Sequence, residues 1–456
     1  MGACVKGSSA NAIAIDLGAT SVRFAKGTWD GSRIYFEIVE QTPHEALEED
    51  GRPCWDVEKL LGFCRMAVSH AKAISSETTI GIDAWGVDHG FVDSSGKLRQ
   101  LPVCYRDPQH QSVFDELAAH RPRLYELTGI AHQPFNTIYQ LIARKRERPA
   151  LPKEGRWLIL PELFALLLGS TAGHEVTQAS TTQLMGTDGS WSQEAFQIAG
   201  WPVPDTQPQE PGSVVGKTAE GVRVVRVGSH DTASAVLGLG ALEPDEAFLN
   251  VGTWSLLGCI LDRPLVSAEA EAANFSNEWT VDGRIRFLKN IPGFYIVNRL
   301  FEDLDLTGTV PDWIDRADQS YAGRIDPLAA DFFNPPSMLE AVRAQLTEDP
   351  PTAEAWSGIA LMSLVEETAR QLEKLEAIVN KQFTKIRVAG GGSNSRAFCE
   401  ALANVSGRAV LAGPGEATVL GNLGAQFLAQ GHFASWQELG DMLRISLSLR
   451  TYHPGE

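Results

Sequence analysis

The fold of this chain is decided by one stretch, Ile13-Ala14-Ile15-Asp16-Leu17-Gly18-Ala19-Thr20-Ser21-Val22-Arg23-Phe24. Alternating apolar residues on both sides of a glycine-containing turn predict the two strands of a β-hairpin. A turn rich in glycine and hydroxyl residues can direct several backbone N–H groups at one anion, and the usual anion is a phosphate. An ordinary hairpin that carries an aspartate at its end explains this stretch equally well when it is taken alone.

The same pattern recurs in the second half of the chain, as Phe248-Leu249-Asn250-Val251-Gly252-Thr253-Trp254-Ser255-Leu256. A repeat at this distance predicts two domains of like topology, each with one phosphate-binding turn. Two such turns that face each other would hold a polyphosphate from both sides, an arrangement that resembles the actin-like, ribonuclease H-like sugar kinases. The expected fold class is therefore α/β, with two actin-like domains and a cleft between them. Gly238 to Asp245 is the expected hinge, which separates residues 11–242 from residues 243–456.

Composition excludes several classes of protein. At 456 residues the chain is too long for one hydrophobic core, and two domains of ordinary size are expected. Its hydrophobic fraction of 43% is typical of a globular protein. The net charge of -18 argues against nucleic acid as a partner, because nucleic-acid phosphates would be repelled. The basic run Arg144-Lys145-Arg146 is expected to be a solvated helix face.

Cysteine spacing and apolar runs indicate the compartment. The six cysteines are dispersed without a C-x-x-C pair, which indicates buried thiols in a reducing compartment instead of a disulfide or zinc framework. The longest apolar run, Leu158 to Leu168, contains Pro161 and Glu162 and is too short to span a bilayer. The first ten residues lack the regions of a secretory signal. We therefore expect a cytoplasmic protein with no membrane partner.

Local patterns predict several further elements of an α/β core. Apolar residues from Val57 to Ala71 fall on one helical face, and Asp56 is the expected N-cap of that helix. Ile34 to Val39 is expected to be a strand, and Thr42 to Pro53 a polar surface loop. Thr79 to Asp93 has the pattern of a second strand–turn–strand unit, and a long helix is expected over Ile359 to Ile378.

Two groups of polar residues could carry chemistry in the first half of the chain. A carboxylate beside a phosphate turn, such as Asp16, can hold Mg²⁺ through water, because Mg²⁺ keeps several of its waters. The alternative is a solvated aspartate at a strand end. Ser229-His230-Asp231-Thr232 lies between a strand and a helix, where an aspartate is by default a helix cap. The functional alternative makes Asp231 the general base for a sugar hydroxyl, with His230 as a hydroxyl ligand instead of a structural residue.

A glycine triplet, Gly390-Gly391-Gly392, lies between an expected strand and an expected helix. Three missing side chains allow another surface, such as an adenine ring or a diphosphate, to approach the backbone closely. The triplet lacks the spacing of G-x-G-x-x-G and the Lys-Ser/Thr of a P-loop, which disfavours both of those folds. A tight strand-to-helix turn is the alternative interpretation.

Taken together, these residues resemble the FGGY carbohydrate kinases and, within that family, the rhamnulokinases. The resemblance covers the chain from about Ala12 to about Phe427. The matching motifs are Asp16-Leu17-Gly18-Ala19, Gly81-Ile82-Asp83-Ala84-Trp85-Gly86-Val87-Asp88, Tyr105-Arg106-Asp107, Phe135-Asn136-Thr137, Ser180-Thr181-Thr182-Gln183-Leu184, Ser229-His230-Asp231-Thr232-Ala233-Ser234-Ala235-Val236, Gly252-Thr253-Trp254-Ser255, Leu288-Lys289-Asn290, Gly390-Gly391-Gly392 and Ala412-Gly413-Pro414. Each motif is short, and their order along the chain is what identifies the family.

The resemblance implies a sugar-binding N-terminal domain, a nucleotide-binding C-terminal domain and ATP- and Mg²⁺-dependent phosphorylation of the 1-hydroxyl of L-rhamnulose. It also implies a role for individual residues. The ketose would be bound by Gly86, His230, Asp231, Thr232 and Asn290, with Asp231 as proton acceptor. The ATP would be bound by Ala19, Thr20, Ser21, Val22, Arg23, Thr253, Asn298 and Gly391, and Mg²⁺ by Asp16 through water.

Three departures from the family pattern concern the nucleotide site. Val22 replaces a glycine, Asn298 replaces a glutamine, and Ser393-Asn394-Ser395 replaces Cys-Gln-Asn after the glycines. They concern the nucleotide contacts more than the reaction. The alternatives that stay open are an FGGY kinase of another ketose such as L-fuculose, a non-catalytic sugar-sensing protein on the same fold, and an actin-like ATPase without a sugar acceptor. A monomer or weak homodimer is expected.

Overall fold

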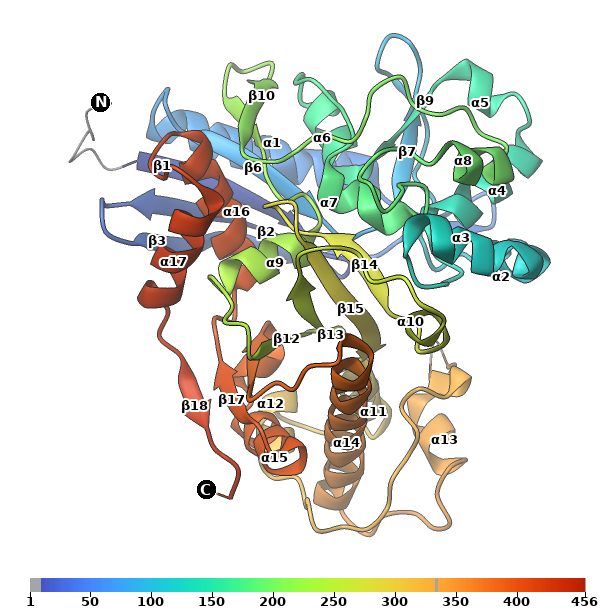
Figure 1. Cartoon of the computed structure of the whole chain (residues 1–456), viewed down its shortest axis with the longest axis vertical. Coiled ribbons are helices and arrows are strands. Elements are labelled where there is room, and N and C mark those ends of the chain that lie inside the picture. Colours follow the sequence, from blue (N-terminus) through green and yellow to red (C-terminus); the bar gives the residue numbers. More distant parts are fainter. Residues whose placement is uncertain (1–9, 333–334, 456) are drawn as a thin grey trace. The chain divides into compact units, whose positions relative to one another are not determined.

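The computed structural model describes residues 10–332 and 335–455 (Figure 1). The predicted buried thiol of Cys4 lies outside the described residues. Within them the chain forms two compact units. The first unit holds residues 10–241, Leu261–Phe287 and Thr418–Ser446, and the second holds Leu242–Ile260, Leu288–Ala417 and residues 447–455. One change of unit falls between Ala241 and Leu242, inside the segment expected to be a hinge. The domain boundary between residues 242 and 243 and the hinge itself stay predictions.

The six-stranded sheet of the first unit is built on the predicted hairpin. Its strands are β1 (Ala10–Leu17), β2 (Ser21–Trp29), β3 (Ile34–Pro43), β6 (Thr79–Ala84), β10 (Ser213–Lys217) and β11 (Arg223–Arg226). The strand order is β10-β11-β6-β1-β2-β3. Strand β1 pairs antiparallel with β2 and parallel with β6, and β6 pairs parallel with β11. The blue strands β1, β2 and β3 lie side by side in Figure 1.

The seven-stranded sheet repeats this topology. Its strands are β12 (Glu246–Val251), β13 (Trp254–Leu261), β14 (Ser276–Trp279), β15 (Ile285–Pro292), β16 (Lys385–Ala389), β17 (Ala409–Ala412) and β18 (Arg450–Tyr452), in the order β14-β15-β13-β12-β16-β17-β18. Strand β12 pairs antiparallel with β13 and parallel with β16, and β16 pairs parallel with β17. The second glycine-and-hydroxyl hairpin therefore occupies the same place in its sheet as the first, which confirms the predicted repeat.

The remaining strands and the helices surround these two sheets. Strands β4 (Leu47–Glu49) and β5 (Arg52–Cys54) form a small hairpin, and β8 (Leu98–Gln100), β7 (His89–Val92) and β9 (Arg156–Ile159) form a three-stranded sheet. The α-helices are α1 (Val57–Ile74), α2 (Gln109–Glu116), α3 (Arg121–Thr128), α4 (Thr137–Glu147), α5 (Leu151–Glu154), α6 (Leu160–Leu167), α7 (Val176–Ala179), α8 (Gln193–Ala199), α9 (Asp231–Gly238), α10 (Ala268–Ala272), α11 (Tyr295–Asp303), α12 (Val310–Asp315), α13 (Met338–Arg343), α14 (Ala353–Val379), α15 (Arg396–Ser406), α16 (Ala417–Ala429) and α17 (Trp436–Ser446).

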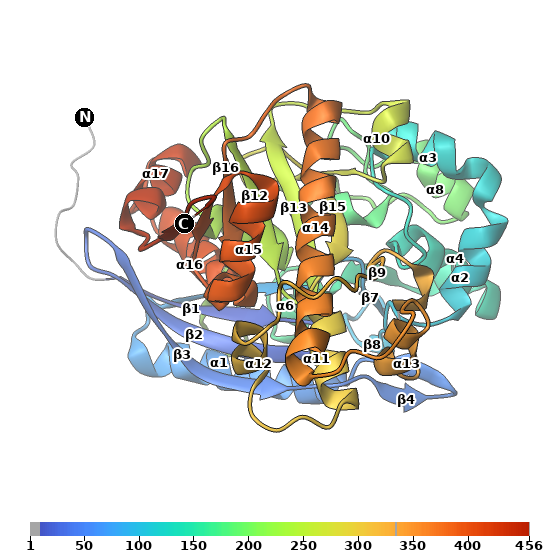
Figure 2. The same cartoon turned by 90° about the horizontal axis from the view of Figure 1, so that it is seen from below.

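Several local predictions are confirmed. Helix α1 begins where it was expected, and the Asp56 carboxylate accepts a hydrogen bond from Lys59 N at 3.0 Å as its N-cap. The long helix α14 is present in the second unit, and α15 lies beside it in Figure 2. The loop predicted for Thr42 to Pro53 is wrong, because β3 extends to Pro43 and the hairpin of β4 and β5 follows.

Helix α16 belongs to the first unit although it lies near the end of the sequence. Gln426 on this helix donates to the backbone carbonyl of Ile13 on β1 at 3.0 Å, and Thr79 on β6 donates to Gln426 at 2.7 Å. Helix α16, one of the two red helices in Figure 1, lies over the sheet there. No helix among residues 10–332 and 335–455 is long and apolar enough to cross a membrane.

Candidate active site

The Ser-His-Asp-Thr corner is fixed in place by its backbone. It follows β11 and leads into α9, and Ala84 N at the end of β6 donates to the Ser229 carbonyl at 2.9 Å. The Gln178 amide donates to the same carbonyl at 3.0 Å and to the Ala84 carbonyl at 3.0 Å. His230 N donates to Thr177 Oγ1 at 3.1 Å. These bonds set the direction in which the side chains of His230 and Asp231 leave the chain.

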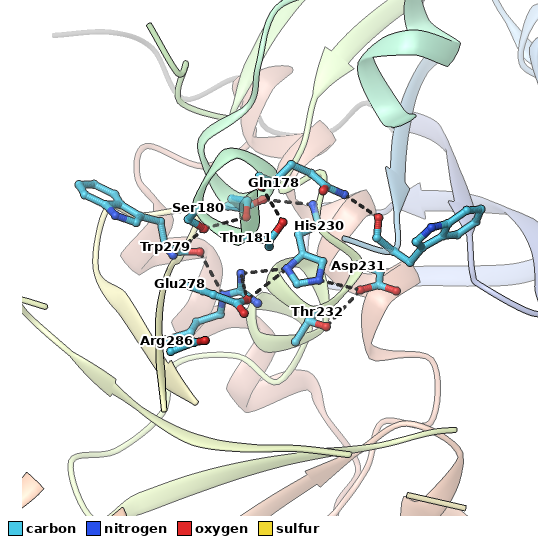
Figure 3. Close-up of polar contacts among 12 residues, drawn as sticks. Gln178, Ser180, Thr181, His230, Asp231, Thr232, Glu278, Trp279 and Arg286 are labelled. Atoms are coloured by element: carbon cyan, nitrogen blue, oxygen red, sulfur yellow. Dashed lines mark hydrogen bonds and ion pairs between the residues drawn. The ribbon is translucent and has the colours of Figure 1, made fainter. Parts of the chain in front are cut away.

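The predicted capping role of Asp231 is wrong. His230 occupies the N-cap position, and Asp231 is the first residue of α9. The Asp231 carboxylate instead accepts a hydrogen bond from Thr232 Oγ1 at 3.1 Å on Oδ1, and His230 Nε2 lies 3.5 Å from the same oxygen. With 28% of its side chain exposed, this carboxylate is open to a ligand and available for chemistry (Figure 3).

Gly86 lies directly beside this carboxylate corner. A Cβ atom added at Gly86 would stand 3.2 Å from His230 Nε2 and 3.3 Å from Thr181 Oγ1. The next residue, Val87, has a φ of 69°, a left-handed conformation that is strained for a β-branched side chain. Thr137 Oγ1 holds it by donating to the Val87 carbonyl at 2.7 Å. The structure thus brings together four of the residues predicted to bind a sugar, Gly86, His230, Asp231 and Thr232.

Two buried charged residues at this corner were missed by sequence reasoning. Arg286 on β15 is fully buried, and its Nη2 lies 3.2 Å from His230 Nδ1 and 3.2 Å from Glu278 Oε2. Glu278, on β14, is also buried and its Oε2 lies 3.4 Å from His230 Nδ1. No local pattern could have found them, because strand pairing and packing bring them to a histidine about fifty residues away in sequence.

Two buried carboxyl groups, those of Glu175 and Glu162, lie next to the Ser-His-Asp-Thr corner. Glu175 Oε2 accepts hydrogen bonds from Ser229 Oγ at 2.8 Å and from Thr177 Oγ1 at 2.5 Å. Glu162 Oε1 accepts from Glu175 N at 3.0 Å. Burial, and then the charge of Glu175, raises the pKa of Glu162 to about 8. Glu162 therefore carries a proton at neutral pH.

The raised pKa of Glu162 predicts a pH-dependent stability. The ordinary pKa of a glutamate is 4.5, so in the unfolded chain Glu162 loses its proton at a lower pH than in the folded protein. The contribution of Glu162 to the free energy of unfolding is therefore complete below pH 4.5 and is lost as the pH rises towards about 8. Glu162→Gln keeps the shape of the protonated acid and is expected to flatten this decline. At pH 9 the variant should unfold at a higher temperature than the parent, and at pH 5 at a similar one. Thermal unfolding across this range measures the effect, with the exposed Glu220→Gln as control; equal slopes in all three proteins would contradict it.

The first phosphate turn lies between β1 and β2. Asp16 and Arg23 are cross-strand partners, and Asp16 Oδ2 accepts from Arg23 Nε at 2.8 Å and Nη2 at 2.7 Å. Thr20 is exposed and Ala19 and Ser21 are half-buried. His44 binds the carbonyls of the turn, with its Nε2 2.7 Å from the Gly18 oxygen and its backbone N donating to the Thr20 oxygen at 3.0 Å. Val22 is only 2% exposed and packs in the core, so its side chain does not crowd the turn. The roles of Ala19 to Arg23 in ATP binding stay predictions.

The carboxylates near Asp16 fit a cation held largely by water. Asp83 on β6 is the strand partner of Asp16 and is fully buried. Its Oδ2 accepts from Asn422 Nδ2 at 2.5 Å, whereas its Oδ1 has no hydrogen-bond partner among the described residues. Burial, and then the charge of Asp16, raises the pKa of Asp83 well above its usual value. No three His, Cys, Asp or Glu side chains in the described ranges form a metal cage, and Mg²⁺ takes few protein ligands.

The second unit holds the corresponding turn and the glycine triplet. Thr253 lies between β12 and β13, half-buried beside the exposed Gly252. Gly390 has a φ of 75°, and a Cβ added at Gly392 would lie 2.3 Å from the Val251 side chain. These two glycines therefore serve the tight turn itself. A Cβ added at Gly391 would meet nothing within 4 Å, so this position is open to a ligand.

Two further predicted residues lie in the second unit. Asn290 is a half-buried residue of β15, and Asn298 is a half-buried residue of α11. The sugar role of Asn290 and the nucleotide roles of Asn298, Thr253 and Gly391 stay predictions, as does the role of Asp16 as a magnesium ligand.

The sequence matches two family models, which describe the N-terminal and the C-terminal domain of one enzyme family. Residues 11–238 match the N-terminal domain of the FGGY family of carbohydrate kinases, and residues 247–430 match its C-terminal domain. Among curated relatives, the rhamnulokinase of Enterococcus faecalis is 32% identical over 97% of this chain and 93% of the relative. The rhamnulokinase of Klebsiella pneumoniae is 32% identical over 97% of this chain and 94% of the relative.

Solved structures share the fold at lower identity. The gluconate kinase of Lactobacillus acidophilus superposes with a TM-score of 0.79 at 16% identity, covering 98% of this chain and 94% of that one. The glycerol kinase of Plasmodium falciparum, solved with ADP, gives a TM-score of 0.76 at 15% identity, covering 98% and 95%. These similarities confirm the predicted α/β fold class with two actin-like domains.

Proposed function

Since the chain belongs to the FGGY family of carbohydrate kinases, we propose that it transfers the γ-phosphoryl group of ATP to the 1-hydroxyl of L-rhamnulose. The enzyme is a carbohydrate kinase that acts on a sugar with ATP and Mg²⁺. The proposal for the acceptor is supported by the rhamnulokinase relatives, which align with nearly the whole chain. The observation that carries the proposal is the corner of Gly86, His230 and Asp231, where the Asp231 side chain, 28% exposed, can meet a sugar hydroxyl.

In the proposed reaction Asp231 is the proton acceptor. Thr232 donates to Oδ1 and His230 lies near that oxygen, so Oδ2 is the atom left to take the proton of the ketose hydroxyl. As the proton moves to Asp231, the sugar oxygen bonds to the γ-phosphorus and the bond to the bridging oxygen of ADP breaks. The transition state is loose, so a weak but well-placed base suffices. Mg²⁺, near Asp16, would neutralise charge on the phosphates.

The first hairpin turn would bind the phosphates in this scheme. Backbone N–H groups of Ala19 to Val22 and the Arg23 guanidinium are the donors proposed for the ATP phosphates. Thr253 and Gly391 are proposed to contact the nucleotide, with Asn298 beside them. Asn290 is proposed as a further ligand of the ketose. Each of these roles rests on the family pattern, and for Ala19, Thr20 and Ser21 also on their partial or full exposure.

An assay of ADP release over a panel of acceptors tests the proposal. L-rhamnulose is expected to stimulate ADP release well above the level without sugar, and above the levels with L-fuculose, D-xylulose and glycerol. A preference for L-fuculose would show that the acceptor is L-fuculose and that the reaction is still phosphoryl transfer to a ketose. Sugar-independent ADP release would indicate an ATPase, and no release with any acceptor would indicate a sugar-sensing protein.

We also propose a cytoplasmic location, with small molecules as the partners of a monomer or weak homodimer. Five cysteines in the described ranges, Cys54, Cys64, Cys104, Cys259 and Cys399, are free and buried. Unpaired thiols are typical of a reducing compartment, which supports the location.

A further inference from the structure

We propose that Arg286, with its charge balanced by Glu278, is a positioning residue that holds the His230 ring with Nδ1 as an acceptor and the ring proton on Nε2, the nitrogen beside Asp231. The inference rests on the proposed function, because it assigns His230 and Asp231 to the ketose site. Figure 3 shows His230 between the two groups, with Arg286 and Glu278 on one side of the ring and Asp231 on the other.

The contacts of Nδ1 decide where the ring proton lies. Arg286 Nη2 is 3.2 Å from Nδ1 with hydrogen-bond geometry, and a guanidinium can only donate. Glu278 Oε2 is 3.4 Å away, an ion-pair distance, and this oxygen has no hydrogen-bond partner among the described residues. Nδ1 therefore accepts from Arg286. A neutral imidazole that accepts at one nitrogen carries its proton on the other, which is Nε2.

Arg286 is itself held rigidly. Its Nε donates to the Trp279 carbonyl at 3.0 Å, and Trp279 N donates to Ser180 Oγ at 3.1 Å. Burial raises the pKa of Glu278, but Arg286 and then His230 together outweigh burial and hold that pKa below its usual range. Glu278 is therefore ionised and balances the guanidinium. Two buried charges are unfavourable unless they are paired, and this pair also contacts His230 through both of its members.

The proton on Nε2 has a defined effect at the site. Nε2 faces Asp231 Oδ1 at 3.5 Å and lies against Gly86, where an added Cβ would stand 3.2 Å away. The N–H can donate to the carboxylate or to a bound sugar oxygen, so it helps to fix Asp231 with Oδ2 free. The other tautomer would turn a lone pair towards Asp231 and repel it.

The direct test is the ¹⁵N spectrum of the full-length protein labelled at histidine, which distinguishes protonated from unprotonated ring nitrogens. His230, identified by the loss of its signals in His230→Gln, is expected to show a protonated Nε2 and an unprotonated Nδ1. The opposite tautomer, or protonation of both nitrogens at neutral pH, would overturn the inference. This result does not depend on which sugar is phosphorylated, so it fails separately from the proposed function.

Three variants extend the test to catalysis. Arg286→Met removes the donor, leaves Nδ1 to donate to Glu278, and is expected to lower kcat by about 10- to 100-fold, the range found when a metal-bound histidine loses its outer partner. The KM for ATP should stay unchanged. Arg286→Lys restores a donor, and Glu278→Gln keeps Arg286, so both should keep the Nε2 proton and most of kcat.

The buried Arg387, 3.6 Å from Glu246 in the second unit, provides the matched control. Arg387→Met makes the same chemical change away from His230, so it should leave the His230 tautomer unchanged. If Arg286→Met retained both the parent tautomer and the parent kcat, Arg286 would be a structural residue only and the inference would be wrong. Should that variant not fold, the parent and Arg286→Lys spectra still decide the matter.

Discussion

Replacing Asp231 with asparagine is expected to lower kcat by at least about 10²-fold, the lower range for loss of a general base. The amide keeps the size of the carboxylate and the hydrogen bond from Thr232, but it cannot take the proton of the ketose hydroxyl. The KM for the ketose should therefore change little. Steady-state kinetics with L-rhamnulose and ATP measure both constants.

The matched control for this experiment is Asp205→Asn, the same change at an exposed position. It should leave kcat at the parent level. Near-normal turnover in Asp231→Asn would show that the carboxylate is not the general base. A large rise in the KM for the ketose with kcat preserved would make Asp231 a binding residue only.

Replacing Gly86 with valine is expected to raise the KM for the ketose by at least about tenfold, a loss of about 1.4 kcal/mol in sugar binding. The added Cβ would already lie 3.2 Å from His230 Nε2 and 3.3 Å from Thr181 Oγ1, and the two methyl groups would fill the space left for a sugar hydroxyl. The KM for ATP should not change, because the residues proposed to bind the nucleotide do not include Gly86. The experiment is a pair of substrate titrations.

Gly62→Val is the control for that substitution, since Gly62 is exposed on α1 and a Cβ there meets nothing within 4 Å. It should give parental constants for both substrates. If Gly86→Val left the ketose KM unchanged, the sugar would have to bind elsewhere and the assignment of the corner would be wrong.

The sequence predicted the parts of the fold that depend on local patterns. The hairpin from Ile13 to Phe24 and its repeat from Phe248 to Leu256 were recognisable because alternating residues and glycine turns are short-range signals. Helix α1 and its cap at Asp56 were predictable for the same reason. The hairpin of β4 and β5 was missed, because strands of three residues are too short to show an alternating pattern.

The candidate site was predictable only in part. Gly86, His230, Asp231 and Thr232 were identified through their motifs, and the structure brings them together in one unit. Whether Asp231 caps α9 depends on a difference of one residue in where the helix begins, which sequence patterns do not fix. Glu278 and Arg286 reach His230 through tertiary packing, so nothing near them in sequence indicates their contact.

The proposed reaction moves a phosphoryl group from ATP to the 1-hydroxyl of L-rhamnulose, with Asp231 as the base. The most direct measurement is ³¹P NMR of the reaction of the parent protein with ATP, Mg²⁺ and L-rhamnulose. We predict equal amounts of ADP and a sugar phosphate whose phosphorus couples to the protons on carbon 1, and almost none with Asp231→Asn. Inorganic phosphate in place of a sugar phosphate, or a phosphate on another carbon, would contradict the account.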